Sequence, residues 1–294
     1  MRAKGGDEGS PSLEPAPTGQ AKGGPPGRSL VKAVATAGAL LGAMGVVYLL
    51  GRVAFFALIV AVALVCLWEV FDALVRAGGR PVASFGLVCA GAMVAVAYFD
   101  RPGLVGAVLV VTMFGAFLLA LRPGRGHNAA SDVAWTVLGV TWIGGGGAGA
   151  ASILVLGPDG LQLLVAFVLI AALDDIGAYF TGTRFGAHRM APSISPAKSW
   201  EGFAGGLACS LLGGGLCAAV LPPLGAVDGI ALGALCGVFG PAGDLAESLV
   251  KRTAGIKDSG RLLPGHGGFL DRLDAMIFCA PVVFLYLRFV ADLA

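Results

Sequence analysis

The chain has 294 residues, of which 56% are hydrophobic and only 13% are charged, and its formal net charge is +2. Because soluble domains carry about 25% charged residues, this composition excludes an ordinary soluble domain. Repeated long apolar runs instead predict an integral membrane protein. The net charge by itself says little about partners, and we expect no nucleic-acid partner.

The first 29 residues are rich in Gly, Pro and Ser and hold almost nothing that can build a core. We predict that residues 1–29 form a disordered cytoplasmic tail. A secretory signal is the alternative, since Ala33, Ala35 and Ala37 resemble a cleavage region. The apolar run continues to Leu50, which is too long for the core of a signal peptide. We therefore expect a retained first span.

A bilayer core requires about 20 apolar residues per helix. The runs that meet this criterion lie roughly at residues 31–50, 53–71, 82–99, 103–121, 132–156, 161–180, 201–221, 229–249 and 273–292. The fifth run is interrupted by glycines 144–147, where a helix can break or pack closely. The expected fold is all-α and polytopic, with about nine transmembrane helices. About five fall in residues 30–160, and residues 161–294 form a catalytic region.

Lysine and arginine test this topology. With the N-terminus in the cytoplasm, only Arg52, Arg101 and Arg288 lie on the outer side, and the other 17 of the 20 basic residues lie inside. The positive-inside rule therefore supports nine spans, with the C-terminus outside. The same topology places the polar loops 181–200 and 251–271 in the cytoplasm.

Small residues recur on the eighth run. Gly229, Gly233 and Gly237 are four residues apart, a spacing that lets helices approach closely. We expect these glycines to serve internal packing, and a homodimer seam is the alternative.

Acidic residues at helical spacing mark the region between the last two spans. Asp244, Glu247 and Lys251 share one face of the eighth helix, and Asp271 and Asp274 share a face where the ninth begins. Carboxylates on two facing helices can hold Mg²⁺, which takes one or two carboxylates and completes its shell with water and substrate phosphates. Two helix ends with solvated salt bridges are the plain alternative.

The loop between these helices is rich in glycine and positive charge. Glycines at 260, 265, 267 and 268 allow positive φ and expose backbone N–H groups, which suits an anion cradle. The cations around this loop are Lys251, Arg252, Lys257 and Arg272. No Walker A pattern occurs.

A second polar stretch begins inside the sixth run. Asp174 and Asp175 are adjacent acids in an apolar span, and Tyr179 lies on the same face as Asp175. Such intramembrane acids are costly and indicate a metal or ion site.

The loop that follows ends with residues 195–202, SPAKSWEG, in which Ser195-Pro196 indicates a turn. Lys198 and the serine hydroxyls can hold phosphate. For Ser199, an N-cap of the next helix and a ligand contact are equally good interpretations.

The remaining polar features have plainer interpretations. His127 and His188 lack metal-ligand spacing, and Glu69, beside Trp68 at the end of the second run, is expected to be an interfacial anchor. The six cysteines all lie in apolar runs, so we predict neither a disulfide framework nor a zinc site.

Residues 248–274, SLVKRTAGIKDSGRLLPGHGGFLDRLD, resemble the signature of bacterial phosphatidate cytidylyltransferases, also called CDP-diacylglycerol synthases, with no departure over 27 positions. Residues 175–179, DIGAY, and 195–202 also resemble that family, with Ser199 where threonine is expected. The resemblance covers residues 165–290 well, and residues 31–160 only as a hydrophobic pattern.

The resemblance implies that CMP passes from CTP to phosphatidate, giving CDP-diacylglycerol and diphosphate in phospholipid biosynthesis. It implies Mg²⁺ as cofactor and leaves a second metal ion open. The expected location is the plasma (inner) membrane, with the active site facing the cytoplasm and phosphatidate supplied by the bilayer.

The matching motifs supply the candidate site residues. Those expected to be catalytic are Lys257, Asp258, His266, Arg272 and Asp274. Those expected to bind substrate are Tyr179, Ser195, Lys198, Ser199, Lys251, Arg252, Gly267 and Gly268. Those expected to bind metal are Asp244 and Asp271 first, and then Asp175.

Two other functions remain open from the residues. A transporter of phosphorylated substrates also suits intramembrane acids and broken helices, but both polar motifs lie in the last 130 residues instead of in two related halves. A CTP-dependent enzyme with another lipid acceptor fits the same motifs.

The topology can be tested by labelling. A cysteine introduced in the 181–198 loop should react with an impermeant reagent only from the cytoplasmic side, and one at the C-terminus only from outside. The expectation follows from the unequal distribution of lysine and arginine. Labelling of both chain ends from the same side would rule out nine spans.

Overall fold

The computed structural model describes residues 42, 45–122, 129–221, 223–255, 260 and 268–293. The chain divides into two compact units, residues 1–46 and 47–294, and all helices named below belong to the second. In the described part of that unit the chain is almost wholly helical, and the strands it contains form a single hairpin.

The helices follow the predicted apolar runs. Their bounds are α2 Arg52–Arg76, α3 Ala83–Tyr98, α4 Pro102–Ala120, α5 Ala129–Gly139, a π-helix (η2) Val140–Gly144, α6 Gly145–Leu154, α7 Gly160–Phe185, α8 Trp200–Val220, α9 Ala226–Thr253, a 3₁₀ turn (η3) Leu270–Arg272 and α10 Asp274–Phe289.

Among the described residues, six helical segments are long and apolar enough to cross a membrane, and α3 is a shorter apolar helix. The chain is therefore an all-α, multi-pass membrane protein. Of the predicted first run, only residue 42 and residues 45–50 are described, and all are helical. The count of nine spans and the side of the N-terminus stay predictions.

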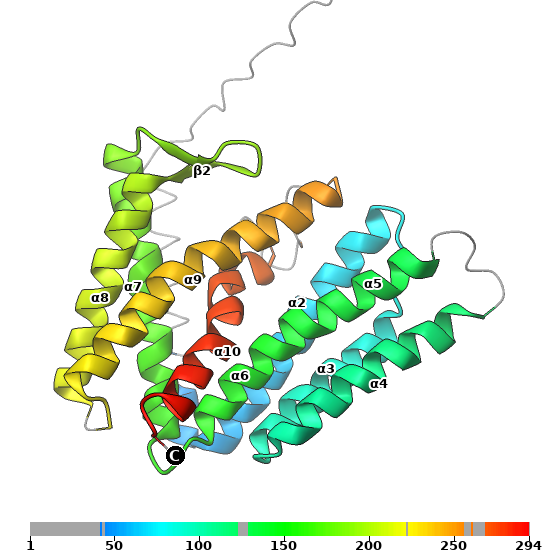
Figure 1. The fold of residues 1–294 in the computed structure, drawn as a ribbon, viewed down its shortest axis with the longest axis horizontal. Helices are drawn as coiled ribbons and strands as arrows, with labels where there is room; N and C mark the ends of the chain where they lie inside the picture. Colours follow the sequence, from blue (N-terminus) through cyan, green and yellow to red (C-terminus); the bar gives the residue numbers. More distant parts are fainter. Residues whose placement is uncertain are drawn as a thin grey trace, which may run out of the picture. The chain divides into compact units, whose positions relative to one another are not determined.

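Helix α10 lies between two groups of helices (Figure 1). On one side it packs against α9, which in turn packs with α7 and α8; on the other it packs against α6, within the group α2–α6. The main apolar core joins α2, α3 and η2–α6 with two residues from the C-terminal segment, Leu270 and Ile277. The C-terminal segment therefore packs into the core of the N-terminal helices.

Glycines set how closely these helices approach. The fifth run does not break at its glycines: it passes through the π-helix into α6, where a side chain at Gly149 would overlap Pro281 of α10. On α9, side chains at Gly229 and Gly233 would overlap carbonyl oxygens of α8. Internal packing thus explains these glycines, and a homodimer stays a prediction.

The polar segment after α7 differs from the predicted loop. It forms an antiparallel hairpin in which β1, Arg189–Ala191, pairs with β2, Ser195–Ser199. The turn predicted at Ser195-Pro196 is wrong, because both residues belong to β2. The chain turns at residues 192–194 instead, where the Ile194 N–H donates to the Ala191 carbonyl oxygen (3.1 Å). Pro192 occupies the second position of this turn, which favours proline because the proline ring fixes φ near the value that the turn requires.

The α8–α9 contact provides a stability test with a neighbouring control. A methyl group at Gly214 would overlap the Gly229 carbonyl oxygen, whereas one at Gly215 would meet no atom within 4 Å. Gly214→Ala should destabilise the protein by about 1–3 kcal/mol through overpacking. Gly215→Ala should be neutral or stabilising by up to ~1 kcal/mol, since alanine is the better helix former. Thermal unfolding in detergent measures both, and equal midpoints would contradict the close contact.

Candidate functional site

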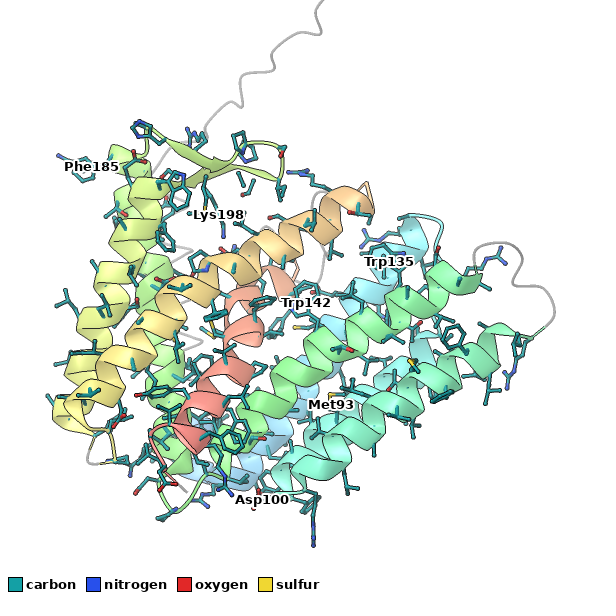
Figure 2. All side chains as sticks on the ribbon, viewed as in Figure 1. Met93, Asp100, Trp135, Trp142, Phe185 and Lys198 are labelled. Carbon is teal, nitrogen blue, oxygen red and sulfur yellow. The ribbon has the colours of Figure 1, made fainter. Side chains whose placement is uncertain are left out.

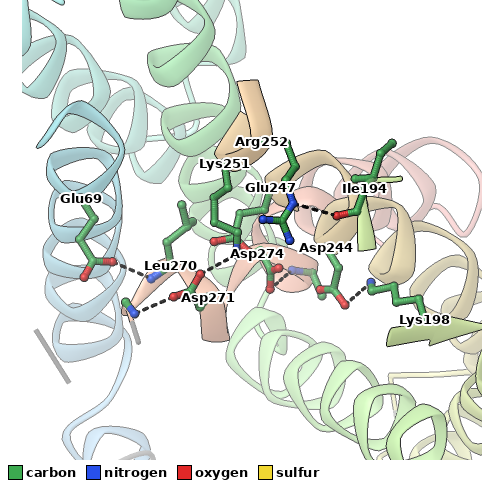
Figure 3. A network of polar contacts seen from close by, with 12 residues as sticks. Glu69, Ile194, Lys198, Asp244, Glu247, Lys251, Arg252, Leu270, Asp271 and Asp274 are labelled. Carbon is green, nitrogen blue, oxygen red and sulfur yellow. Dashed lines mark hydrogen bonds and ion pairs between the residues drawn. The ribbon is translucent and has the colours of Figure 1, made fainter. Parts of the chain in front are cut away.

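A network of paired charges joins the hairpin, the C-terminal half of α9 and the start of α10 (Figure 3). Lys198, at the end of β2, lies between the hairpin and α9 (Figure 2). Its Nζ donates to the Asp244 carboxylate and to the Pro241 carbonyl oxygen (3.2 Å). Both charged side chains are only 22–29% exposed, so this pair lies at the edge of the helix bundle.

Lys251 makes the second set of ion pairs. Its Nζ lies 3.1 Å from Glu247 Oε2, one turn earlier on α9, and 2.8 Å from Asp271 Oδ1 on η3. The other oxygen of Asp271 accepts a hydrogen bond from the Gly268 N–H (2.6 Å). These contacts fix the 3₁₀ turn against the end of α9.

The surroundings of Asp271 keep it ionised. Burial raises the pKa of this carboxyl, but hydrogen bonds from neighbouring side chains and from the Gly268 N–H, together with the charge of Lys251, outweigh burial and lower the pKa to about 2. Asp271 is therefore a carboxylate throughout the neutral pH range.

Further carboxyls crowd the same region. Asp274 begins α10 and is 6% exposed; its Oδ1 accepts a hydrogen bond from the Ala275 N–H (2.9 Å), and its carboxyl lies within hydrogen-bonding reach of Asp244. Asp174 of α7 is 2% exposed, whereas its neighbour Asp175 is exposed. Asp244, Asp174 and Asp175 are close enough to interact electrostatically.

The three predicted metal ligands do not converge as one set. Asp244 lies beside Asp274, while both oxygens of Asp271 accept hydrogen bonds from Lys251 and Gly268. Across the described ranges, no group of three His, Cys, Asp or Glu side chains is placed to hold a metal ion.

The donor set nevertheless suits Mg²⁺. This ion prefers oxygen ligands and binds through one or two carboxylates while it keeps water and substrate phosphates. Asp244 and Asp274, on facing helices, offer such a pair. Two buried carboxyl oxygens nearby, Asp174 Oδ1 and Glu247 Oε1, also lack a partner among the described residues.

The predicted substrate-binding residues are placed as follows. Ser199 is the N-cap of α8: it is 4% exposed, and its Oγ accepts from the Gly202 N–H (3.2 Å). Tyr179 is 66% exposed on α7. Arg252 donates through Nε to the Ile194 carbonyl oxygen of the hairpin (3.3 Å).

Two further predicted site residues lie at the ends of short elements. Ser195 begins β2, and Arg272 ends η3 with an exposed side chain. The predicted residues that lie outside the described ranges are Lys257, Asp258, His266 and Gly267.

The interpretation of Glu69 as an interfacial anchor is wrong. Its side chain is 0% exposed, and its Oε2 accepts a hydrogen bond from the Leu270 N–H (2.9 Å), at the start of η3. A signal was present in the sequence: Glu69 comes three residues after Cys66 and four before Ala73, and both are on the buried stripe of α2.

Two further acids of this region, Glu247 and Asp174, are not among the predicted site residues. Glu247 was recognised only as a neighbour of Asp244 on one helix face, and its four-residue spacing to Lys251 was the available signal for the ion pair. Asp175 was predicted as a metal ligand in place of Asp174, although Asp174 follows Ile170 by four residues and Ala171 by three, on the buried stripe of α7.

Comparison with known proteins gives consistent findings. The sequence model of the cytidylyltransferase family matches residues 31–290. The chain is 40% identical over 144 residues to the uncharacterized protein YnbB of Escherichia coli, covering 48% of each chain. It is 38% identical over 192 residues to a phosphatidate cytidylyltransferase of Mycobacterium bovis, covering 63% of this chain and 62% of the relative. For a phosphatidate cytidylyltransferase of Brucella suis the values are 36% over 180 residues and 61% of each. The chain thus spans about half to three-fifths of the length of these relatives.

Metal binding can be measured without an activity assay. If Asp244 holds Mg²⁺, the ion should stabilise detergent-solubilised protein by about 2.7 kcal/mol at a hundredfold excess over Kd, and so raise its thermal unfolding midpoint. Asp244→Asn should remove this rise. Asp72→Asn, which changes a carboxylate of α2 that is 44% exposed and paired with Arg76, should keep it. A rise that survives in Asp244→Asn would exclude that residue as a ligand.

Proposed function

The chain belongs to the cytidylyltransferase family, and we propose that it transfers CMP from CTP to phosphatidate, giving CDP-diacylglycerol and diphosphate. Relatives named phosphatidate cytidylyltransferase support this acceptor. The observation that carries the proposal is the pair of partly buried lysines, Lys198 and Lys251, set among carboxylates in an apolar helix bundle.

The reaction needs positioning and charge neutralisation more than proton transfer. A phosphate oxygen of phosphatidate forms a bond to the α-phosphorus of CTP, and the bond from that phosphorus to the bridging oxygen of the β-phosphate breaks. Because the second pKa of a phosphate monoester is about 6, the attacking oxygen already carries charge near pH 7. Fixed cations that stabilise the charge on diphosphate are the main requirement.

The two lysines suit this role. Each lysine pairs with a carboxylate in the structure, and the side chain of each is only 17–22% exposed. In such partly buried surroundings a cation interacts more strongly with phosphate than it does in water. Lys198 stands at the hairpin and Lys251 at the end of α9, so anionic groups placed between the hairpin and η3 can meet both.

Magnesium is part of the proposal. Asp244 and Asp274 are the carboxylates best placed to hold it, with Asp271 and Asp175 as further candidates from the sequence. When bound, Mg²⁺ would neutralise charge on the phosphates of the nucleotide. The carboxylates themselves position that charge and keep the lysines in place.

The location follows from the substrates. Phosphatidate is held in the bilayer and CTP is dissolved in the cytoplasm, so we propose an inner-membrane protein whose site faces the cytoplasm. The contact between Arg252 and the Ile194 carbonyl brings the hairpin and the end of α9 together, which supports one site at one membrane face.

The reaction can be assayed directly. Purified protein in detergent should form CDP-diacylglycerol and diphosphate from CTP and phosphatidate with Mg²⁺ present. Asp244→Asn should lower the rate roughly hundredfold, as loss of a transition-state contact does, while Asp72→Asn should retain it. Full activity in excess chelator would contradict the metal-dependent reaction, and product formation only with another lipid acceptor would change the assigned substrate.

His266 separates positioning from proton transfer. Since the nucleophile has no proton to lose near pH 7, His266→Gln should lower the rate less than Asp244→Asn does. The rate of the variant should not change with pH across the neutral range. If the substitution instead abolishes a titration near pH 6–7, His266 is a general base.

A further inference from the structure

Glu69 is a charged residue inside the core of the N-terminal helices. It is 0% exposed on α2, where its neighbours on the buried stripe include Cys66, Val70 and Phe71. Burying a carboxylate costs several kcal/mol unless hydrogen bonds compensate. The contacts of Glu69 must therefore offset the cost of burying its side chain.

Those contacts are with residues 248–274, the segment that resembles the family signature and is called the signature segment. It lies about 200 residues later in the chain. Glu69 Oε2 accepts the Leu270 N–H at 2.9 Å (Figure 3). The backbone of Gly260 lies against the other oxygen: a Cβ on Gly260 would overlap Glu69 Oε1, which has no hydrogen-bond partner among the described residues. Gly260 itself is buried. One carboxylate thus touches the chain before and after residues 261–267.

Leu270 is adjacent in sequence to Asp271, which belongs to the network of paired charges around Lys251. Leu270 is 1% exposed in the same core as α2, and the next residue, Asp271, pairs with Lys251. A displacement of the Leu270 backbone would move Asp271 away from its partners Lys251 and Gly268. Glu69 is therefore linked to the network through the backbone of Leu270 and Asp271.

We propose that Glu69 is a positioning residue, which fixes the backbone at Gly260 and Leu270 and thereby holds Asp271 in register with Lys251. Helix α2 of the N-terminal half then holds the backbone of the signature segment in place. The effect on catalysis rests on the proposed CMP transfer, whereas the effect on the backbone does not.

The test compares three variants. Glu69→Gln keeps an oxygen that can accept the Leu270 N–H, and Glu69→Ala removes it. Asp132→Ala is the matched control, because Asp132 is also a buried carboxylate (2% exposed) but accepts its backbone N–H from Arg80 (2.6 Å), in the segment between α2 and α3.

Hydrogen–deuterium exchange of residues 268–273 without substrate gives the first readout. Glu69→Ala should speed exchange there at least tenfold, while Glu69→Gln and Asp132→Ala should stay within threefold of the unsubstituted protein. The second readout is kcat for CMP transfer per folded protein, which should fall at least tenfold in Glu69→Ala and stay within threefold in the other two.

The outcomes separate the two claims. If Glu69→Ala changes exchange and kcat no more than Asp132→Ala does, Glu69 is only structural and the proposal is wrong. If the unsubstituted protein transfers no CMP, the proposed function fails, and exchange alone decides the role of Glu69. If Glu69→Ala does not fold, Gly260→Ala replaces it, since its methyl group presses on the same carboxylate and should give the same exchange and kcat changes.

Discussion

The cost of charge inside an apolar helix bundle constrains the whole structure. A carboxylate or ammonium group removed from water loses several kcal/mol of hydration, so it must find an opposite charge or a backbone hydrogen bond. Lys198 and Lys251 meet this need for Asp244, Glu247 and Asp271. The Lys198–Asp244 pair joins β2 to α9 and the Lys251–Asp271 pair joins α9 to η3, whereas the Lys251–Glu247 pair lies within α9. The hairpin, the end of α9 and the turn before α10 are held together by these pairs.

The same constraint makes the N-terminal helices part of the site. Helix α10 packs on α6 through glycines, and Leu270 lies in the core formed by α2 and α3. Glu69 adds a polar contact to this apolar one. The segment from Leu270 to α10 is thus supported from the N-terminal half, and substitutions at that interface are expected to act at a distance on the paired charges.

Hydropathy predicted most of the fold, because length and apolar content alone determine which segments can form long buried helices. The sites were only partly predictable. Helical spacing correctly grouped Glu247 with Lys251, but it gave no information on which carboxylate of a later segment Lys251 would meet. The turn at Ser195-Pro196 failed because an earlier proline already turned the chain. The interpretation of Glu69 as an interfacial anchor failed because its partner, the Leu270 N–H, is a backbone group that no side-chain pattern reveals.

The central claim is that the two lysines, held by carboxylates, form the phosphate-binding part of a CMP transfer site. An experimental structure with Mg²⁺ and an unreactive CTP analogue measures this most directly. We expect nucleotide phosphates in contact with Lys198 and Lys251, and the metal beside Asp244. A nucleotide bound elsewhere, with the Lys198–Asp244 and Lys251–Asp271 pairs unchanged, would contradict the claim.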